Sequence, residues 1–149
     1  YSLVKYAYKK DEITQSYYRQ ILYDRLISDY NRLLDFKFKQ IHFHFPDNIS
    51  FLRMHKPSRF GDDLTNSRFS IKEVNRTLKP LDGYEIGKLV DGFRFVYPIF
   101  DDKTKTVDVR FVLDNKDLKL FKEASKDSSL LSISIFILLK LFKRVLNSL

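Results

Sequence analysis

The stretch of residues 41–63, IHFHFPDNISFLRMHKPSRFGDD, constrains the fold more than any other part of the chain. It holds all three histidines of the protein, its only methionine and an adjacent pair of aspartates. Residues 39–45 alternate as a strand does, with His42 and His44 on one face and apolar residues on the other. A proline turn follows, and residues 50–55 form a second short strand. The stretch therefore predicts two adjacent strands with many polar groups set among aromatic ones.

Before it, residues 9–36 are predicted to form one long helix, since residues 8–36 contain neither proline nor glycine. Apolar residues recur at helical spacing along one side, namely Tyr23, Ile27, Tyr30 and Leu34, beside a stripe of Leu22, Leu26 and Leu33. The opposite face, expected to be solvated, carries Lys10, Arg19, Arg25 and Arg32. Such a helix is longer than a small core can cover, so we expect it to extend towards a membrane or a partner helix.

The second half of the chain predicts an antiparallel meander. Residues 71–79 suit a short helix that ends before Pro80, and Asp82-Gly83 is a turn signal. Strands are expected at 84–90, 93–100 and 107–113, with a hairpin turn at Asp91-Gly92 and another turn at 101–106.

The tail from 115 to 149 is predicted to be helical. Six apolar residues between Leu131 and Leu149 follow a heptad pattern, which favours a packed or dimer-forming helix. The apolar run 130–139 is shorter than the ~20 residues of a membrane span. The start of a span and an edge strand remain the alternatives for residues 130–149.

Composition narrows the class of protein. The chain has 149 residues, of which 44% are hydrophobic, so one domain with a packed core is expected. The absence of cysteine excludes disulfides and thiolate metal sites. The net charge of +8 fits a lysine-rich soluble surface, and attraction to an anionic ligand, an anionic lipid or a nucleic acid remains open.

Two constellations could form a site. Three neutral imidazoles, those of His42, His44 and His55, could hold a metal ion. Alternatively, the positive charges near Arg53 and Arg68 stand beside acidic residues, an arrangement suited to an anion or a zwitterion. No Gly-x-Ser-x-Gly elbow and no phosphate loop is present, so neither an enzymatic activity nor a cofactor is expected.

The order of these motifs resembles a known family. FHFPDNISFLRMHKPSRFGDDL, followed by GYEIG and FRFVYPIFD, is similar to the Cache superfamily, in particular to the double-Cache-like type written FHLPDNRSFLRLHKPEKFGDDL. The resemblance covers residues 41–101 and the long helix that enters them. One departure is VDVRFVL, which stands where family members usually carry a strand of the type GSVEISF.

The resemblance implies a mixed α/β (α+β) fold, with a PAS-like antiparallel sheet, a long N-terminal helix and a helical C-terminal exit. Residues 1–149 would form one sensor domain: a signalling helix at 1–38, the sheet and pocket at 39–114, and C-terminal helices at 115–149. Matching positions give the candidate ligand-binding residues His44, Arg53, His55, Asp62, Asp63, Arg68, Glu85 and Tyr97.

The function implied is that of a periplasmic sensor domain in an inner-membrane receptor: a chemoreceptor, a histidine kinase or a diguanylate cyclase. It would bind a small carboxylate, an amino acid or a similar polar solute, and signal as a homodimer by rearranging its helices. Two alternatives remain at this stage. One is a His-cluster metal-binding sensor or enzyme, and the other is a basic nucleic-acid-binding module.

Overall fold

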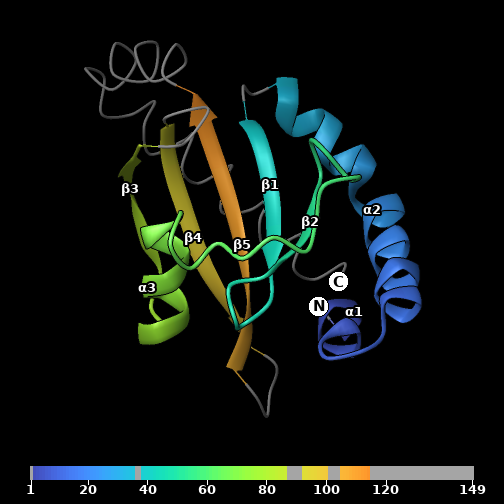
Figure 1. The fold of residues 1–149 in the computed structure, drawn as a ribbon. Helices are drawn as coiled ribbons and strands as arrows, with labels where there is room; N and C mark the ends of the chain where they lie inside the picture. The colour runs from blue at the N-terminus through green and yellow to red at the C-terminus, as the bar shows by residue number, and fades with distance from the viewer. Residues whose placement is uncertain (1, 36–37, 87–91, 101–104, 115–149) are drawn as a thin grey trace.

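A computed structural model describes residues 2–35, 38–86, 92–100 and 105–114 (Figure 1). The helices are α1 (Ser2–Ala7), α2 (Glu12–Asp35) and α3 (Phe69–Thr77). The strands are β1 (Phe38–His44), β2 (Ser50–Arg53), β3 (Leu81–Glu85), β4 (Gly92–Phe100) and β5 (Lys105–Asp114). The expected mixed fold with an antiparallel sheet and a long N-terminal helix is confirmed, whereas the predicted helices at 115–149 lie outside the described residues.

The five strands form one antiparallel sheet in the order β2-β1-β5-β4-β3. The predicted meander appears as β3, β4 and β5, but its first strand is Leu81–Glu85 and not 84–90, of which residues 87–90 lie outside the described part of the chain. Among the described strands the first pairs with the last, so β1 lies inside the sheet between β2 and β5 (Figure 1). The histidines of β1 are thereby carried into the interior of the sheet.

Helix α2 begins after Asp11, whose carboxylate accepts hydrogen bonds from the Thr14 amide at 2.9 Å and the Thr14 hydroxyl at 2.7 Å. This is a side-chain cap of the helix N-terminus. The predicted stripe is largely confirmed, because Leu22, Leu26 and Leu33 are buried. The expectation for Leu34 is wrong: it is 40% exposed, because the buried side of α2 runs through Leu33.

One face of the sheet packs against α1 and α2. Ile41, Phe43 and Phe45 of β1 and the following turn join the leucines of α2 in a single buried cluster. Phe51 and Leu52 of β2 belong to the same cluster. No helix in the described part of the chain is both long and apolar enough to cross a membrane.

The opposite face, here called the site face, carries His42 and His44. Helix α3 lies over β3 and β4 on this side, and the connection from β2 to α3 crosses in front of the sheet (Figure 1). We call residues 54–68 the cover segment. It is held to the turn after β1 by a hydrogen bond in which the side-chain nitrogen Nδ2 of Asn48 donates to the Thr65 hydroxyl at 3.1 Å. Asn75 of α3 donates to the side-chain oxygen of Asn48 at 2.7 Å.

Two turn predictions are wrong. Asp82 and Gly83 lie inside β3, opposite Phe95 and Arg94 of β4, because the ladder between these strands overrides the local turn preference. Gly92 is already the first residue of β4 and pairs with Glu85, so no two-residue hairpin forms at Asp91-Gly92.

Arg19 also departs from its prediction as a solvated residue, since only 6% of it is exposed. Its Nε donates to the carbonyl oxygen of Phe51 at 2.7 Å. The guanidinium carbon lies 3.5 Å from the centre of the Phe60 ring and 5.3 Å from that of Phe51. Helical periodicity could not show that β2 and the cover segment would lie over this position.

Candidate ligand site

A local irregularity between β1 and β2 assembles the site face. Phe43 pairs with Leu52, but His44 pairs with Ser50, so two steps along β2 match one step along β1. Such a bulge adds one residue to a strand and shifts its alternation. As a result Ser50 and Arg53, three positions apart, both join the face of the two histidines, while Phe51 and Leu52 remain in the core.

His42 and His44 form a buried part of this face. Their rings are 3.9 Å apart between centroids, and they are 3% and 0% exposed. His42 Nε2 lies 2.7 Å from Ser50 Oγ. Burial lowers the pKa of His42 well below 6.5, and electrostatic interactions with His44 and Arg53 lower it further. His42 is therefore neutral at pH 7.

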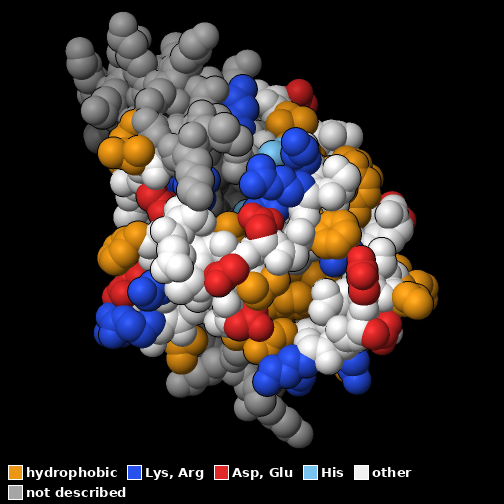
Figure 2. Space-filling model, viewed as in Figure 1, with side chains coloured by type: hydrophobic (Ala, Val, Ile, Leu, Met, Phe, Trp, Pro, Cys, Tyr) orange, Lys and Arg blue, Asp and Glu red, His pale blue; other side chains and the backbone are white. Residues whose placement is uncertain are grey.

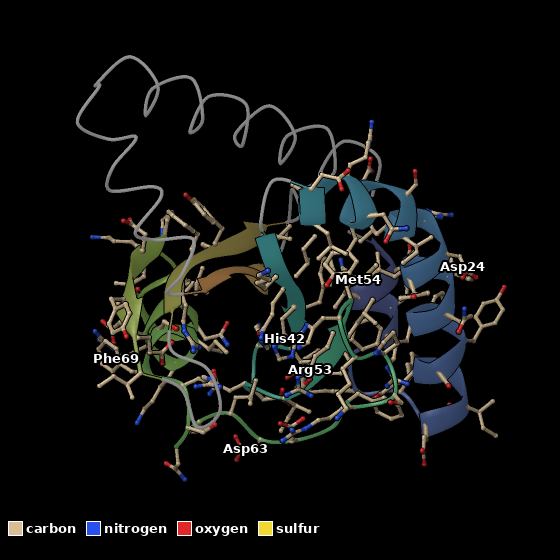
Figure 3. The ribbon with its side chains drawn as sticks, turned by 90° about the horizontal axis from the view of Figure 1, so that it is seen from above. Asp24, His42, Arg53, Met54, Asp63 and Phe69 are labelled. Atoms are coloured by element: carbon tan, nitrogen blue, oxygen red, sulfur yellow. The ribbon has the colours of Figure 1, made fainter. Side chains whose placement is uncertain are left out.

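Arg53 fastens the cover segment to the sheet. Its two terminal nitrogens each donate to one oxygen of the Asp62 carboxylate, both at 2.7 Å, and Nη1 also donates to the Arg59 carbonyl at 2.7 Å. This is a bidentate, charge-assisted pair. The bonds from Arg53 lower the pKa of Asp62 below its usual range. Arg53 lies beside His42 in Figure 3, as their pairing across β1 and β2 requires.

A second ion pair lies where β4 meets α3. Arg94, only 1% exposed, has Nη1 3.1 Å from the Glu85 carboxylate. Ser70, in the first turn of α3, donates its hydroxyl to the same oxygen, Glu85 Oε2, at 2.7 Å. The predicted site residue Glu85 is therefore already engaged by two partners.

Arg68, another predicted site residue, forms no ion pair within the described residues. It occupies the N-cap position of α3 and is partly buried. Its Nη1 is buried and forms no hydrogen bond within the described structure. Among the charges that lower the pKa of His42, that of Arg68 contributes least.

Three of the predicted residues are not brought to this group. His55 is exposed beyond β2; desolvation, then the charges of Arg53 and Lys56, lower its pKa to about 4. Asp63 is exposed and accepts the Thr65 amide at 2.8 Å (Figure 3). Tyr97 lies on the opposite face of β4 from Arg94 and Val96, which is the core side of the sheet.

The metal hypothesis receives no support from this geometry. His55 lies outside the buried pair of His42 and His44, and the described residues contain no group of three or more His, Cys, Asp or Glu placed to hold a metal ion. A pair of imidazoles with one nitrogen already bonded to Ser50 is a structural polar pair.

Sequence reasoning missed three members of the group: Ser50, Ser70 and Arg94. The sequence does contain an indication for Arg94, since a single arginine between Phe93 and Phe95 in a strand is expected to need an acidic partner if it is buried. The two serines left none, because their roles depend on the bulge in β2 and on the docking of α3.

Comparison with known proteins gives a family. A model described as a double sensory domain of two-component sensor kinases matches residues 24–143. No curated protein matches the chain significantly. Among solved structures, the extracellular domain of vpHK1S-Z8, described as a histidine kinase, is similar with 16% identity and a TM-score of 0.46. The likeness covers 78% of this chain but only 46% of that one, so the chain spans less than half its length.

Proposed function

Because the chain belongs to the family of double sensory domains of two-component sensor kinases, we propose that it binds a small polar solute outside the cytoplasm and signals through its helices. The family match confirms the resemblance inferred from the motifs in 41–101. A periplasmic location, membrane tethering and a homodimer belong to this proposal. A histidine kinase is the favoured receptor class, and a chemoreceptor or a diguanylate cyclase is an alternative output.

The observation that carries the proposal is the polar character of a buried sheet face. A sheet covered on both sides normally buries apolar residues on both faces. Here the site face buries His42, His44, Ser50, Arg53 and Arg94 beneath the cover segment and α3. Buried polar groups are costly unless they are paired, and their concentration at one place fits recognition of a solute. On the surface, Figure 2 shows Lys and Arg side chains beside an exposed histidine on the side that faces the viewer.

We propose recognition without chemistry. The bond between His42 Nε2 and Ser50 Oγ is close enough for a base and a nucleophile. However, Ser50 is only 1% exposed, and no carboxylate bonded to His42 is found in the described part of the chain. The pair lacks both access and the third group that would orient a catalytic imidazole.

Signalling would follow from population shift. A solute that binds one arrangement of sheet, cover segment and α3 more tightly favours that arrangement by its difference in affinity. Helix α2 packs against β1 and β2, so a change at the site face can reach it through these strands.

Calorimetric titration of the purified domain tests the proposal, with a panel of carboxylates, amino acids and uncharged polar solutes. We expect at least one compound to bind with a stoichiometry of one and to lose at least about tenfold in affinity in Arg68→Met. Arg76→Met is the matched control, because Arg76 lies exposed on the same helix and pairs with Glu73. Absence of any binder would overturn the proposed function, whereas equal affinity in Arg68→Met would overturn only the assignment of Arg68 to the binding site.

A further inference from the structure

We propose that Asn48 is a positioning residue of the site. It holds residues 63–68 of the cover segment closed over the site face, and a solute enters where this stretch lifts away. We call residues 63–68 the gate. The inference rests on the proposed function and adds the residue that controls access to the buried polar groups. It is carried by the hydrogen bonds of Asn48 and by the firmer attachment of the chain on either side of the gate.

The chain that flanks the gate is firmly attached. Before the gate, Arg53 holds both carboxylate oxygens of Asp62 at 2.7 Å. After the gate, α3 lies over β3 and β4 (Figure 1), and its residues Ile71 and Val74 are both 0% exposed. A bidentate charge-assisted pair and fully buried apolar side chains are both strong attachments. The gate is therefore a short stretch of chain between two fixed points.

The gate itself is held to the sheet mainly through Asn48. The Leu64 amide donates to the carbonyl oxygen of Asn48 at 3.1 Å, and Nδ2 of Asn48 donates to the Thr65 hydroxyl at 3.1 Å. One backbone bridge, between Ile49 and Asp63, accompanies these bonds. Leu64 is the one fully buried residue of the gate. Both bonds of Asn48 join neutral groups, and such bonds are roughly half as strong as charge-assisted ones. The gate should therefore open more readily than the chain on either side of it.

Asn48 is itself braced by α3 and by the turn after β1. Its Oδ1 accepts from Nδ2 of Asn75 in α3 at 2.7 Å. Its amide donates to the Phe45 carbonyl oxygen at 3.0 Å, which closes the turn. Its φ of 67° lies in the left-handed region, which Asn adopts more easily than most residues with a side chain. The side chain of Asn48 thus links the firmly packed helix to the hydroxyl of Thr65 in the gate.

The polar groups that need an entrance lie close to Asn48 in the sheet. Ser50, two residues further along the chain, pairs with His44 across the strands, and its hydroxyl lies 2.7 Å from Nε2 of His42. The exposed fractions of His42, His44 and Ser50 are 3%, 0% and 1%. A solute can meet groups buried to this degree only after part of the cover has moved. The gate combines weak attachment with a position beside these residues.

Two measurements on the domain without added solute test the inference. Amide hydrogen exchange, followed by NMR, reports opening at Leu64 in the gate and at Gly61 before it, where the amide donates to the Ser50 carbonyl oxygen at 2.8 Å. Labelling with diethyl pyrocarbonate, read by mass spectrometry, reports access to the imidazoles of His42 and His44. Exchange shows whether the gate opens, and labelling shows whether the opening reaches the site face.

Thr65→Val removes the acceptor of Asn48 Nδ2 with little change of shape. We expect the Leu64 amide to exchange about three- to tenfold faster, and the two imidazoles to be labelled faster by a similar factor, because one neutral hydrogen bond is lost. Exchange at Gly61 should stay unchanged. Asn48→Gly, which tolerates the positive φ, should have a larger effect. Asn66→Ala, at an exposed position of the gate, is the matched control and should change neither readout.

The outcomes separate access from structure. Faster exchange at Leu64 without faster labelling would make Asn48 a structural residue only and overturn the inference. An equal increase at Gly61 would also overturn it, because the cover segment would then open as a whole. If the α2 amides show that Asn48→Gly unfolds globally, the result for Thr65→Val decides. Faster labelling through the gate, together with no binder in the calorimetric titration, would contradict the proposed function alone.

Discussion

At the scale of single residues, the pair formed by Arg53 and Asp62 is asymmetric. The Arg53 side chain is 9% exposed, whereas that of Asp62 is 34% exposed. Removing the acid leaves a nearly buried cation without its partner, while removing the arginine leaves a carboxylate that water can reach. We expect Asp62→Asn to lower the free energy of unfolding by about 1–3 kcal/mol, and Arg53→Met to lower it less. Urea unfolding monitored by circular dichroism measures both.

The neighbouring acid provides the control for this prediction. Asp63→Asn keeps an oxygen that can accept the Thr65 amide, and no ion pair of Asp63 occurs within the described residues. Its effect should stay within about 0.5 kcal/mol. A larger loss in Asp63→Asn than in Asp62→Asn would contradict the assignment of the pair.

His42 predicts how stability depends on pH. Its pKa in the folded protein lies well below 6.5, since burial and nearby positive charges disfavour the imidazolium, whereas the unfolded imidazole titrates near 6.5. Between these values the unfolded state binds more protons, so the free energy of unfolding rises with pH. His55, with its pKa of about 4, acts in the same direction.

We therefore expect the domain to lose stability as the pH falls from ~7 to ~5, the range below the unfolded pKa. Urea midpoints at several pH values measure this. His42→Gln and His55→Gln should each flatten the dependence, because the pKa of both imidazoles is lowered in the folded protein. A pH dependence as steep in His42→Gln as in wild type would show that another group is responsible.

At the scale of elements, α2 is held by its leucines. Leu26 is 1% exposed and belongs to the cluster shared with β1 and β2. Leu26→Ala should lower the free energy of unfolding by about 2–5 kcal/mol, through lost burial and a residual cavity. Ile13→Ala, at an 84% exposed position of the same helix, should change little. Equal effects of the two substitutions in urea unfolding would show that α2 is not anchored through this stripe.

The sequence predicts these elements where local pattern and tertiary packing agree. The alternation of 39–45 gives β1, and the helix predicted at 71–79 appears as α3, two residues earlier. The prediction fails where packing decides. Asp82-Gly83 is a good turn in isolation but lies in a ladder with β4. Arg19 has the helical phase of a solvated residue, yet Phe60, 41 positions away, covers it.

The candidate site was predictable only in part for the same reason. The motif points to Arg53, Asp62 and Arg68, because charged residues crowd one short stretch of sequence. Which acid pairs with which arginine depends on the bulge that aligns Ser50 with His44, and on the docking of α3 that brings Ser70 to Glu85. Neither event has a local sequence pattern.

At the scale of the whole molecule, the sheet pairs the first described strand with the last. β1 lies between β2 and β5 and carries both the core residues Ile41 and Phe43 and the site residues His42 and His44. β3 forms one edge and pairs only with β4 among the described strands. Separating β1 from its neighbouring strands therefore also disrupts its packing against α2. By contrast, we expect β3 to separate from β4 while the rest of the sheet stays folded.

Native-state hydrogen exchange should show this difference. Amides of β1 should exchange only by global unfolding and those of β3 by local opening, since exchange protection follows the size of the cooperative unit. In Leu26→Ala the β1 amides should lose protection by the full change in stability, ~30-fold for 2 kcal/mol, while β3 amides keep theirs. A β3 strand that is as protected as β1 and equally sensitive to Leu26→Ala would mean that α3 and β3 unfold only with the rest of the sheet. In that case a solute bound under α3 would stabilise the whole domain at once, with no local opening of the site.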